Sequence, residues 1–211
     1  MAAERSAAVR SRDVESEATR RTILAAAEAL LAAGGEDGLS IRELCARAGV
    51  TPPTIYHHFG DKGALVDRVV ADCFAEFDAA LARRAAPADP VDALAWAFER
   101  YVEYGAAHPT HYRLMFQHAV RRRIPAGIAS YDRLRRMVQA VADAGRLALS
   151  VEVATRACWC TAHGVTSLIV GGFFERHDPA VEVVRDALMA EITQSAPARR
   201  MRRRTPRRSR A

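Results

Sequence analysis

A short segment with a central glycine constrains the fold of this 211-residue chain more than any other feature. The segment reads SIRELCARAGVTPPTIYHHFGDK and runs from Ser40 to Lys62. Apolar residues recur at helical spacing on both sides of Gly49, and a glycine permits the positive φ that a sharp turn between two helices requires. The pattern is typical of a helix-turn-helix, whose second helix enters the major groove of DNA.

Start signals on both sides of Gly49 favour the same structure. Ser40 followed by Glu43 predicts a capping box at the first short helix. Thr51 is an N-cap candidate for the second helix, and Pro52 occupies its first position, where a missing N–H costs nothing. We expect the apolar residues of the segment to form a small core, made of Ile41, Leu44, Val50 and Ile55.

Helical periodicity continues along the rest of the chain. Alanine and leucine, both good helix formers, dominate the composition. We expect an all-α fold of about nine helices, in which an N-terminal three-helix helix-turn-helix head is joined by a fourth helix to a second helical domain. Asp61 is the expected N-cap of the fourth helix, which runs to about Arg84. Further helices are expected at about 91–107, around Tyr112, and at about 127–146, 151–174 and 178–194.

Changes in composition divide the chain into four parts. We expect a disordered arm over residues 1–16, the head over 17–77 with its motif at 40–59, a second domain over 90–195, and a disordered Arg-rich tail over 196–211. The tail holds eight arginines and no acidic residue, whereas the whole chain has a net charge of +6, which leaves −2 for the remainder. Because the folded part is not basic overall, any affinity for DNA has to come from local geometry.

Several classes of protein are disfavoured. No apolar stretch approaches the roughly 18 residues of a membrane span, and the charged N-terminus lacks the apolar core of a signal peptide, so we expect a cytoplasmic protein without membrane contact. The four cysteines form no Cys-x-x-Cys pair and are expected to be reduced core residues. There is no phosphate-binding glycine loop, nucleophile elbow or paired-carboxylate motif, so we expect no enzyme activity, no catalytic residue and no cofactor.

Two groups of side chains have the chemistry of metal ligands. One consists of His108, His111 and His118, and the other of Cys158, Cys160 and His163. Neither spacing matches a known zinc pattern, and Pro109 interrupts the register of the first group. We therefore expect no metal site.

The segment from Gly38 to Val66 resembles the DNA-binding signature of TetR-family regulators, and the likeness covers about residues 17–77. The resemblance implies that Tyr56 and Lys62 hold phosphates, while residues on and near the second helix face bases or the backbone. Threonine hydroxyls can bond base edges, and threonine methyl groups and proline rings can contact a thymine methyl. The full set of expected DNA-binding residues is Ser40, Arg42, Thr51, Pro52, Pro53, Thr54, Tyr56, His57, His58 and Lys62.

The pair Pro52–Pro53 departs from the family pattern, which often has a polar residue, glycine or serine there. Farther along the chain, Trp159, His163 and Gly164 resemble the Trp-x-x-x-His-Gly signature of one C-terminal subclass. This resemblance implies a homodimer through the helices near 151–174 and 178–194, where small residues would permit close approach across a two-fold axis.

The same resemblance implies a ligand pocket in the second domain. Its candidate lining residues are mostly aromatic and carry few charges, so the ligand is expected to be largely apolar or aromatic. They are Phe98, Tyr101, Tyr104, Tyr112, Met115, Phe116, Trp159 and His163.

These features together predict a ligand-responsive transcriptional regulator. The family default is a repressor that binds a palindromic operator in double-stranded DNA as a dimer and leaves it when a small effector binds. Two alternatives remain open. One is a metal- or small-molecule-sensing module with weak specific DNA binding, and the other is a non-specific DNA binder driven by the arginine tail.

Overall fold

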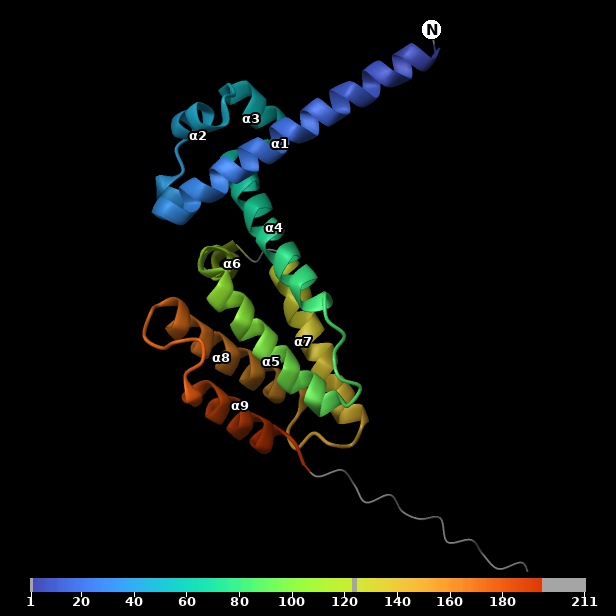
Figure 1. Ribbon diagram of the computed structural model, residues 1–211, viewed down its shortest axis with the longest axis vertical. Coiled ribbons are helices and arrows are strands. Elements are labelled where there is room, and N and C mark those ends of the chain that lie inside the picture. The colour runs from blue at the N-terminus through green and yellow to red at the C-terminus, as the bar shows by residue number, and fades with distance from the viewer. Residues whose placement is uncertain (1, 123–124, 195–211) are drawn as a thin grey trace, which may run out of the picture.

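The computed structural model describes residues 2–122 and 125–194, in which the regular elements are nine helices (Figure 1). The expected all-α fold is confirmed. The helices are α1 (Ala2–Gly38), α2 (Ile41–Ala48), α3 (Pro52–Phe59), α4 (Lys62–Ala82), α5 (Pro90–Ala107), α6 (Pro109–Arg122), α7 (Pro125–Asp143), α8 (Val151–Val170) and α9 (Pro179–Ile192).

Helix α1 begins at Ala2 and extends well beyond the rest of the head (Figure 1), whereas a disordered arm was expected over residues 1–16. The extension is rich in alanine, arginine and glutamate, which propagate a helix once its later turns are fixed by packing. Those later turns bury Ile23, Ala27 and Leu31. The regular helix is interrupted at Gly35, whose φ of 63° lies in the left-handed region that glycine adopts without strain.

The head has a compact core of fully buried aliphatic side chains from four helices. Ile23 of α1, Leu44 of α2, Ile55 of α3 and Leu65 of α4 are each 0% exposed. Ile41 and Val50, the other two residues of the expected core, are partly buried and pack against it.

The N-cap residues of the two short helices do not make the side-chain bonds that the sequence predicts. Ser40 makes no side-chain capping bond, so the prediction of a capping box is wrong. The Glu43 carboxylate, which would complete the box, instead pairs with Arg47 one turn later at 2.8 Å. Thr51 makes no capping bond either, and its hydroxyl lies 3.1 Å from that of Thr54. Asp61 does cap α4, where its carboxylate accepts the N–H of Ala64 at 2.7 Å.

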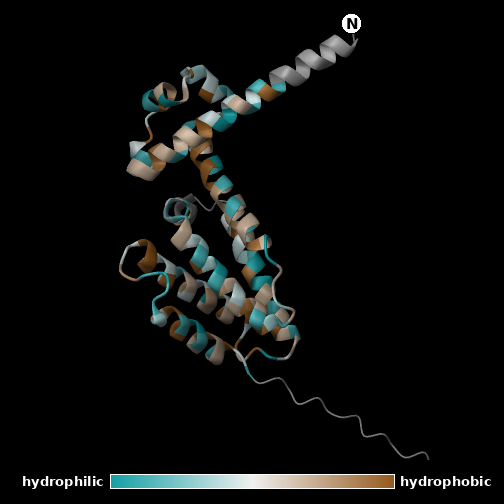
Figure 2. Cartoon of the chain, viewed as in Figure 1, coloured by the Kyte–Doolittle hydropathy of each residue, from teal (hydrophilic) through white to brown (hydrophobic). Residues whose placement is uncertain are grey.

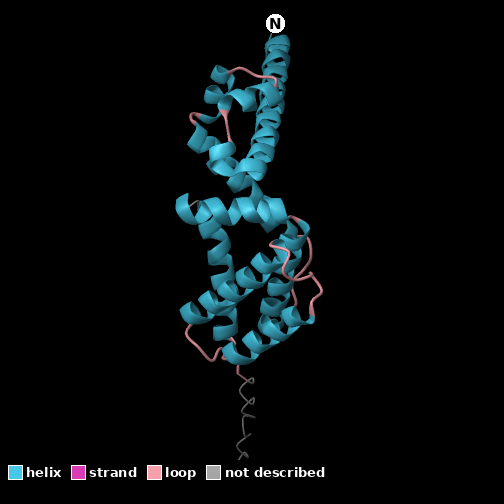
Figure 3. Cartoon of the chain, turned by 90° about the vertical axis from the view of Figure 1, so that its left-hand side faces the viewer, coloured by secondary structure: helices cyan, strands magenta, loops and turns pink. Residues whose placement is uncertain are grey.

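Helix α4 connects the head with the lower bundle and contributes to both. Its buried stripe runs from Leu65 in the head to Phe77 in the bundle. Helix α6, seen nearly end-on in Figure 1 and lying across the molecule in Figure 3, packs against α4 and α1. Below it, α5 and α7 pack on α8, and α9 packs on α8 and α5. The head and the bundle are therefore joined by α4 and by the contact of α6 with α1.

None of the described helices combines the length and apolar character needed to cross a bilayer. All four cysteines are free thiols, and Cys73 and Cys158 are buried as expected. Cys160 is exposed, because α8 turns this side chain away from the core that Cys158 enters two residues earlier.

Candidate nucleic-acid interface and effector cavity

The turn between α2 and α3 is made by Gly49, whose φ of 66° and ψ of 32° are left-handed. A β-carbon at this conformation is strained, so the glycine lets α3 leave α2 abruptly. Ile55 anchors α3 in the head core. The opposite face of α3 is therefore held rigidly at the surface.

None of the ten expected DNA-binding residues is buried. Thr54, His58 and Lys62 are partly exposed, and the other seven are exposed: Ser40, Arg42, Thr51, Pro52, Pro53, Tyr56 and His57. All ten belong to α2, α3, their capping residues or the first position of α4. The head therefore brings the whole set together on adjoining elements.

The cations around α3 differ in how far they are neutralised. Arg47 is paired with Glu43 at 2.8 Å. Within the described part of the chain, Arg42 and Lys62 have no ion-pair partner. These two side chains are the ones available to an external anion such as a DNA phosphate.

A cation–π contact that the sequence did not predict supports α3 from behind. The Arg20 guanidinium carbon lies 5.6 Å from the centroid of the Phe59 ring, so α1 contacts the end of α3. His58 lies beside the same ring, with centroids 6.1 Å apart. Arg20 and Phe59 are 39 positions apart in sequence, so no local pattern could have predicted their cation–π contact.

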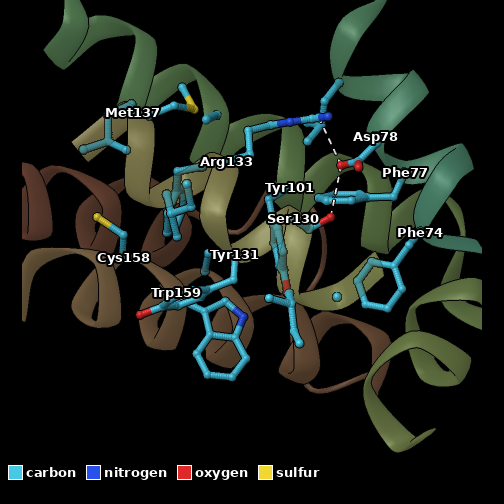
Figure 4. Close-up of a pocket in the computed structure, with 18 of the residues that line it drawn as sticks. Phe74, Phe77, Asp78, Tyr101, Ser130, Tyr131, Arg133, Met137, Cys158 and Trp159 are labelled. Carbon is cyan, nitrogen blue, oxygen red and sulfur yellow. Dashed lines mark hydrogen bonds and ion pairs between the residues drawn. The ribbon is translucent and has the colours of Figure 1, made fainter. Parts of the chain in front are cut away.

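A cavity of about 390 Å³ lies in the bundle between α4, α5, α7 and α8, with single contributions from α6 and α9 (Figure 4). Four of the eight expected pocket residues line it: Phe98, Tyr101, Phe116 and Trp159. Most of the other lining side chains are also apolar. They include Phe74 and Phe77 of α4 and Met137 of α7.

The other four expected pocket residues do not line the cavity. Tyr104 turns toward Phe77, His108 and His111, because it lies three positions beyond Tyr101 on α5 and faces α6. Met115 is buried in the core that joins the head to the bundle. Tyr112 and His163 bond to one another behind the cavity wall.

The bond between Tyr112 and His163 supports the aromatic wall. The Tyr112 hydroxyl lies 2.6 Å from Nδ1 of His163 and 3.2 Å from the Ser167 hydroxyl. Burial lowers the pKa of His163, which favours the neutral ring, and the Tyr112 hydroxyl also donates to the His163 backbone carbonyl at 3.0 Å. The Trp159 ring stacks on the same imidazole with centroids 5.8 Å apart. The network thus fixes the orientation of a ring that lines the cavity.

One side of the cavity is polar. The Asp78 carboxylate of α4 accepts the Ser130 hydroxyl at 3.1 Å and pairs with Arg133 at 3.0 Å, and both partners belong to α7 (Figure 4). Sequence reasoning missed this group, because Asp78 is more than 50 positions away from both Ser130 and Arg133. Among the side chains that the structure describes, no set of three or more histidine, cysteine or acidic residues is placed to hold a metal ion. The side chain of His118, the third histidine of the first group, and the arginine tail lie outside what the structure describes.

Two family models match this chain. The model described as bacterial regulatory proteins, tetR family, matches residues 23–69, which contain the helix-turn-helix. The model described as tetracyclin repressor-like, C-terminal domain, matches residues 94–192, which contain most of α5, all of α6 to α9 and most of the cavity wall. The two matches thus cover both parts of the molecule described above.

Individual relatives agree with these matches. The chain is 34% identical over 100 residues to an HTH-type transcriptional repressor of Streptomyces coelicolor, a match that covers 47% of this chain and 49% of that relative, so it spans about half the length of the curated protein. A solved structure of a protein of unknown function from Rhodococcus sp. RHA1 is 31% identical, with a TM-score of 0.69 over 83% of this chain and 96% of that chain. A Shewanella sp. PV-4 structure assigned to tetR family transcription regulators shares the fold at 18% identity, with a TM-score of 0.72 over 84% of this chain and 99% of that chain.

Proposed function

Because this chain belongs to the TetR family of bacterial transcription regulators, we propose that it is a cytoplasmic, ligand-responsive repressor without enzymatic activity. It binds a palindromic operator as a homodimer and is released by a small, largely apolar molecule. One observation carries the proposal: α4 begins beside the exposed helix-turn-helix and ends as a wall of the cavity. A molecule in the cavity therefore contacts the helix that holds the DNA-binding head.

DNA contacts in this proposal divide by chemistry. Tyr56 and Lys62 hold phosphates on the two sides of the groove entered by α3, and Arg42 approaches from α2. Thr51, Thr54 and His57 face base edges, together with Pro52 and Pro53 at the start of the helix. Partly exposed His58 and exposed Ser40 complete the contact with the backbone.

The homodimer in this proposal forms through α8, α9 and the turn between them. Large apolar side chains are exposed there: Leu168 is 40% exposed, Phe173 76% and Val183 65%. The end of α8 and the turn after it form a strongly hydrophobic tip in Figure 2. Exposed apolar surface of this kind is normally covered by a partner. A two-fold pairing would also place two heads on one operator.

Ligand release follows from differential binding. The cavity includes Phe74, Phe77 and Asp78 of α4, so a ligand that fits one position of α4 better than another shifts the spacing of the two heads. Helix-turn-helix dimers require their half-sites about 34–36 Å apart, and a changed spacing lowers affinity.

A gel-shift assay on the DNA upstream of the gene tests the proposal. The full chain should shift this DNA in preference to a scrambled duplex of equal length, and a chain truncated after Ser195 should retain that preference. Loss of most affinity on truncation would instead favour a non-specific binder that uses the arginine tail. Native mass spectrometry of the purified protein would reveal a retained metal or small molecule, as expected for a sensing module.

A further inference from the structure

The outer face of α3 lacks the side chains that read a purine with two hydrogen bonds. Arginine does so at guanine, and asparagine or glutamine does so at adenine. The helix sequence PPTIYHHF contains none of the three. Its exposed side chains are Pro52, Pro53, Tyr56 and His57, and Thr54 is partly exposed.

The first turn of α3 is also poor in hydrogen-bond donors. Pro52 and Pro53 have no N–H, and the N–H of Thr54 already donates to the Thr51 carbonyl at 3.0 Å. The hydroxyls of Thr51 and Thr54 lie 3.1 Å apart and bond to one another. This bond uses one of the two hydroxyl protons, so only the other can be donated to a base. The surface that would meet the bases first is therefore formed by two exposed proline rings.

In a helix-turn-helix, the N-terminal residues of the second helix contact the base edges. The apolar feature of a base edge in the major groove is the C5-methyl group of thymine. We propose that Pro52 and Pro53 select the operator half-site through C5-methyl groups, of thymine or equally of 5-methylcytosine. This inference rests on the proposed function, because it assumes that α3 is the helix that enters the groove.

Two consequences separate this mode from hydrogen-bond readout. Removing one contacted methyl, by replacing thymine with uracil, leaves every hydrogen-bonding group of the base pair intact. A buried methyl corresponds to about a fourfold change in affinity. Replacing the same thymine by cytosine removes the same methyl group and should weaken binding by about the same fourfold, and a C5-methyl group on that cytosine should restore the affinity. A cytosine-methylated operator would thus be distinguished from an unmethylated one.

The experiment begins with selection of bound duplexes from a random library by the full-length protein. The selected half-site is resynthesised with uracil at one thymine at a time, and each dissociation constant is measured by fluorescence anisotropy at fixed salt. We expect a loss of about fourfold at one or two adjacent thymines of each half-site and no loss at flanking thymines. For the Pro52→Ala and Pro53→Ala variants, the loss of affinity caused by uracil should largely disappear at one or more of the sensitive thymines.

Pro90→Ala is the matched control, because Pro90 occupies the first position of α5, far from the head. This variant should show the same loss of affinity with uracil as the unmodified protein. Thermal unfolding should show that the α3 variants remain folded. Uracil without effect at every half-site position would overturn the inference and leave the proposed function standing, as would penalties that persist in both α3 variants. If the library yields no enriched sequence, the proposed function itself fails and this inference fails with it.

Discussion

His111 on α6 places its Nε2 atom 2.9 Å from Oε1 of Glu28 on α1, so a side chain of the ligand-binding bundle bonds directly to the DNA-binding head. The Nδ1 atom of the same ring lies 3.0 Å from the Tyr104 hydroxyl. Burial and the nearby Glu76 carboxylate raise the pKa of Tyr104, so its hydroxyl keeps the proton that it donates. The imidazole thus links α5 and α6 to α1. On the other side of α6, Arg113 donates to the Val170 carbonyl of α8 at 3.0 Å.

The bond between His111 and Glu28 predicts energetic coupling between the two parts of the molecule. His111→Ala and Glu28→Gln should each lower stability by about 1 kcal/mol, because the carboxylate is partly exposed and the bond is partly screened. For a chain of this size that corresponds to about 2–4 °C in the unfolding midpoint. The double variant should lose less than the sum of the two changes.

Glu43→Gln is the control for this cycle, since Glu43 pairs with Arg47 on the surface of a single helix. That change should cost no more than about 0.5 kcal/mol. Strictly additive effects of the His111 and Glu28 substitutions would contradict the coupling.

His163 predicts a pH dependence of stability. Burial holds its folded-state pKa below the ordinary value of 6.5. The unfolded chain therefore binds this proton more readily, so the stability is fully present above pH 6.5 and is lost as the pH falls below it. Protonation places a proton on both ring nitrogens, so Nδ1 then only donates in its contact with the Tyr112 oxygen.

His163→Gln should flatten the fall of the unfolding midpoint between pH 7 and pH 5 while lowering its value at pH 7.5. The difference between the two curves isolates His163 from the other histidines. Parallel curves for the two proteins would show that His163 does not titrate differently in the folded state.

The cavity predicts saturable binding of an apolar fluorescent probe such as an anilinonaphthalene sulfonate. Ala97 lines the cavity, so Ala97→Phe places a ring in space that is empty and should weaken probe binding at least tenfold with little loss of stability. Phe173→Ser is the control, because this ring is 76% exposed and lies outside the cavity. Equal probe affinity in wild type and Ala97→Phe would exclude the cavity as the binding site.

Lys62 and Tyr56 predict a sequence-independent contribution to DNA affinity. Lys62→Ala should weaken binding to all duplexes and reduce the slope of log K against log salt by about one, because one phosphate contact is lost. Tyr56→Phe should weaken binding to the same duplexes without changing that slope. Arg47→Ala should change the slope little, since Glu43 already neutralises this arginine. An unchanged slope for Lys62→Ala would remove Lys62 from the phosphate contacts.

Local patterns predicted the head better than the bundle. Gly49 and the spacing of Leu44 and Ile55 act within a few residues, so the helix-turn-helix could be read directly from the chain. Ser40 shows the limit of such signals, because Glu43 had a competing partner in Arg47.

The cavity depended on contacts that no local pattern contains. Tyr101 and Tyr104 differ by three positions on one helix, yet the first lines the cavity and the second faces α6. The polar side, where Asp78 meets Ser130, joins helices about 50 residues apart in sequence. Such pairs are set by how the helices cross, and helix periodicity alone does not contain that information.

A footprint on the operator selected from the random library is the most direct test of a dimeric, DNA-binding regulator. The full-length protein should protect two half-sites related by a two-fold axis, with centres about 34–36 Å apart or a multiple of one helical turn. Lys62→Ala should weaken protection at both half-sites equally. A single protected site without two-fold symmetry, or uniform protection along the duplex, would contradict the account.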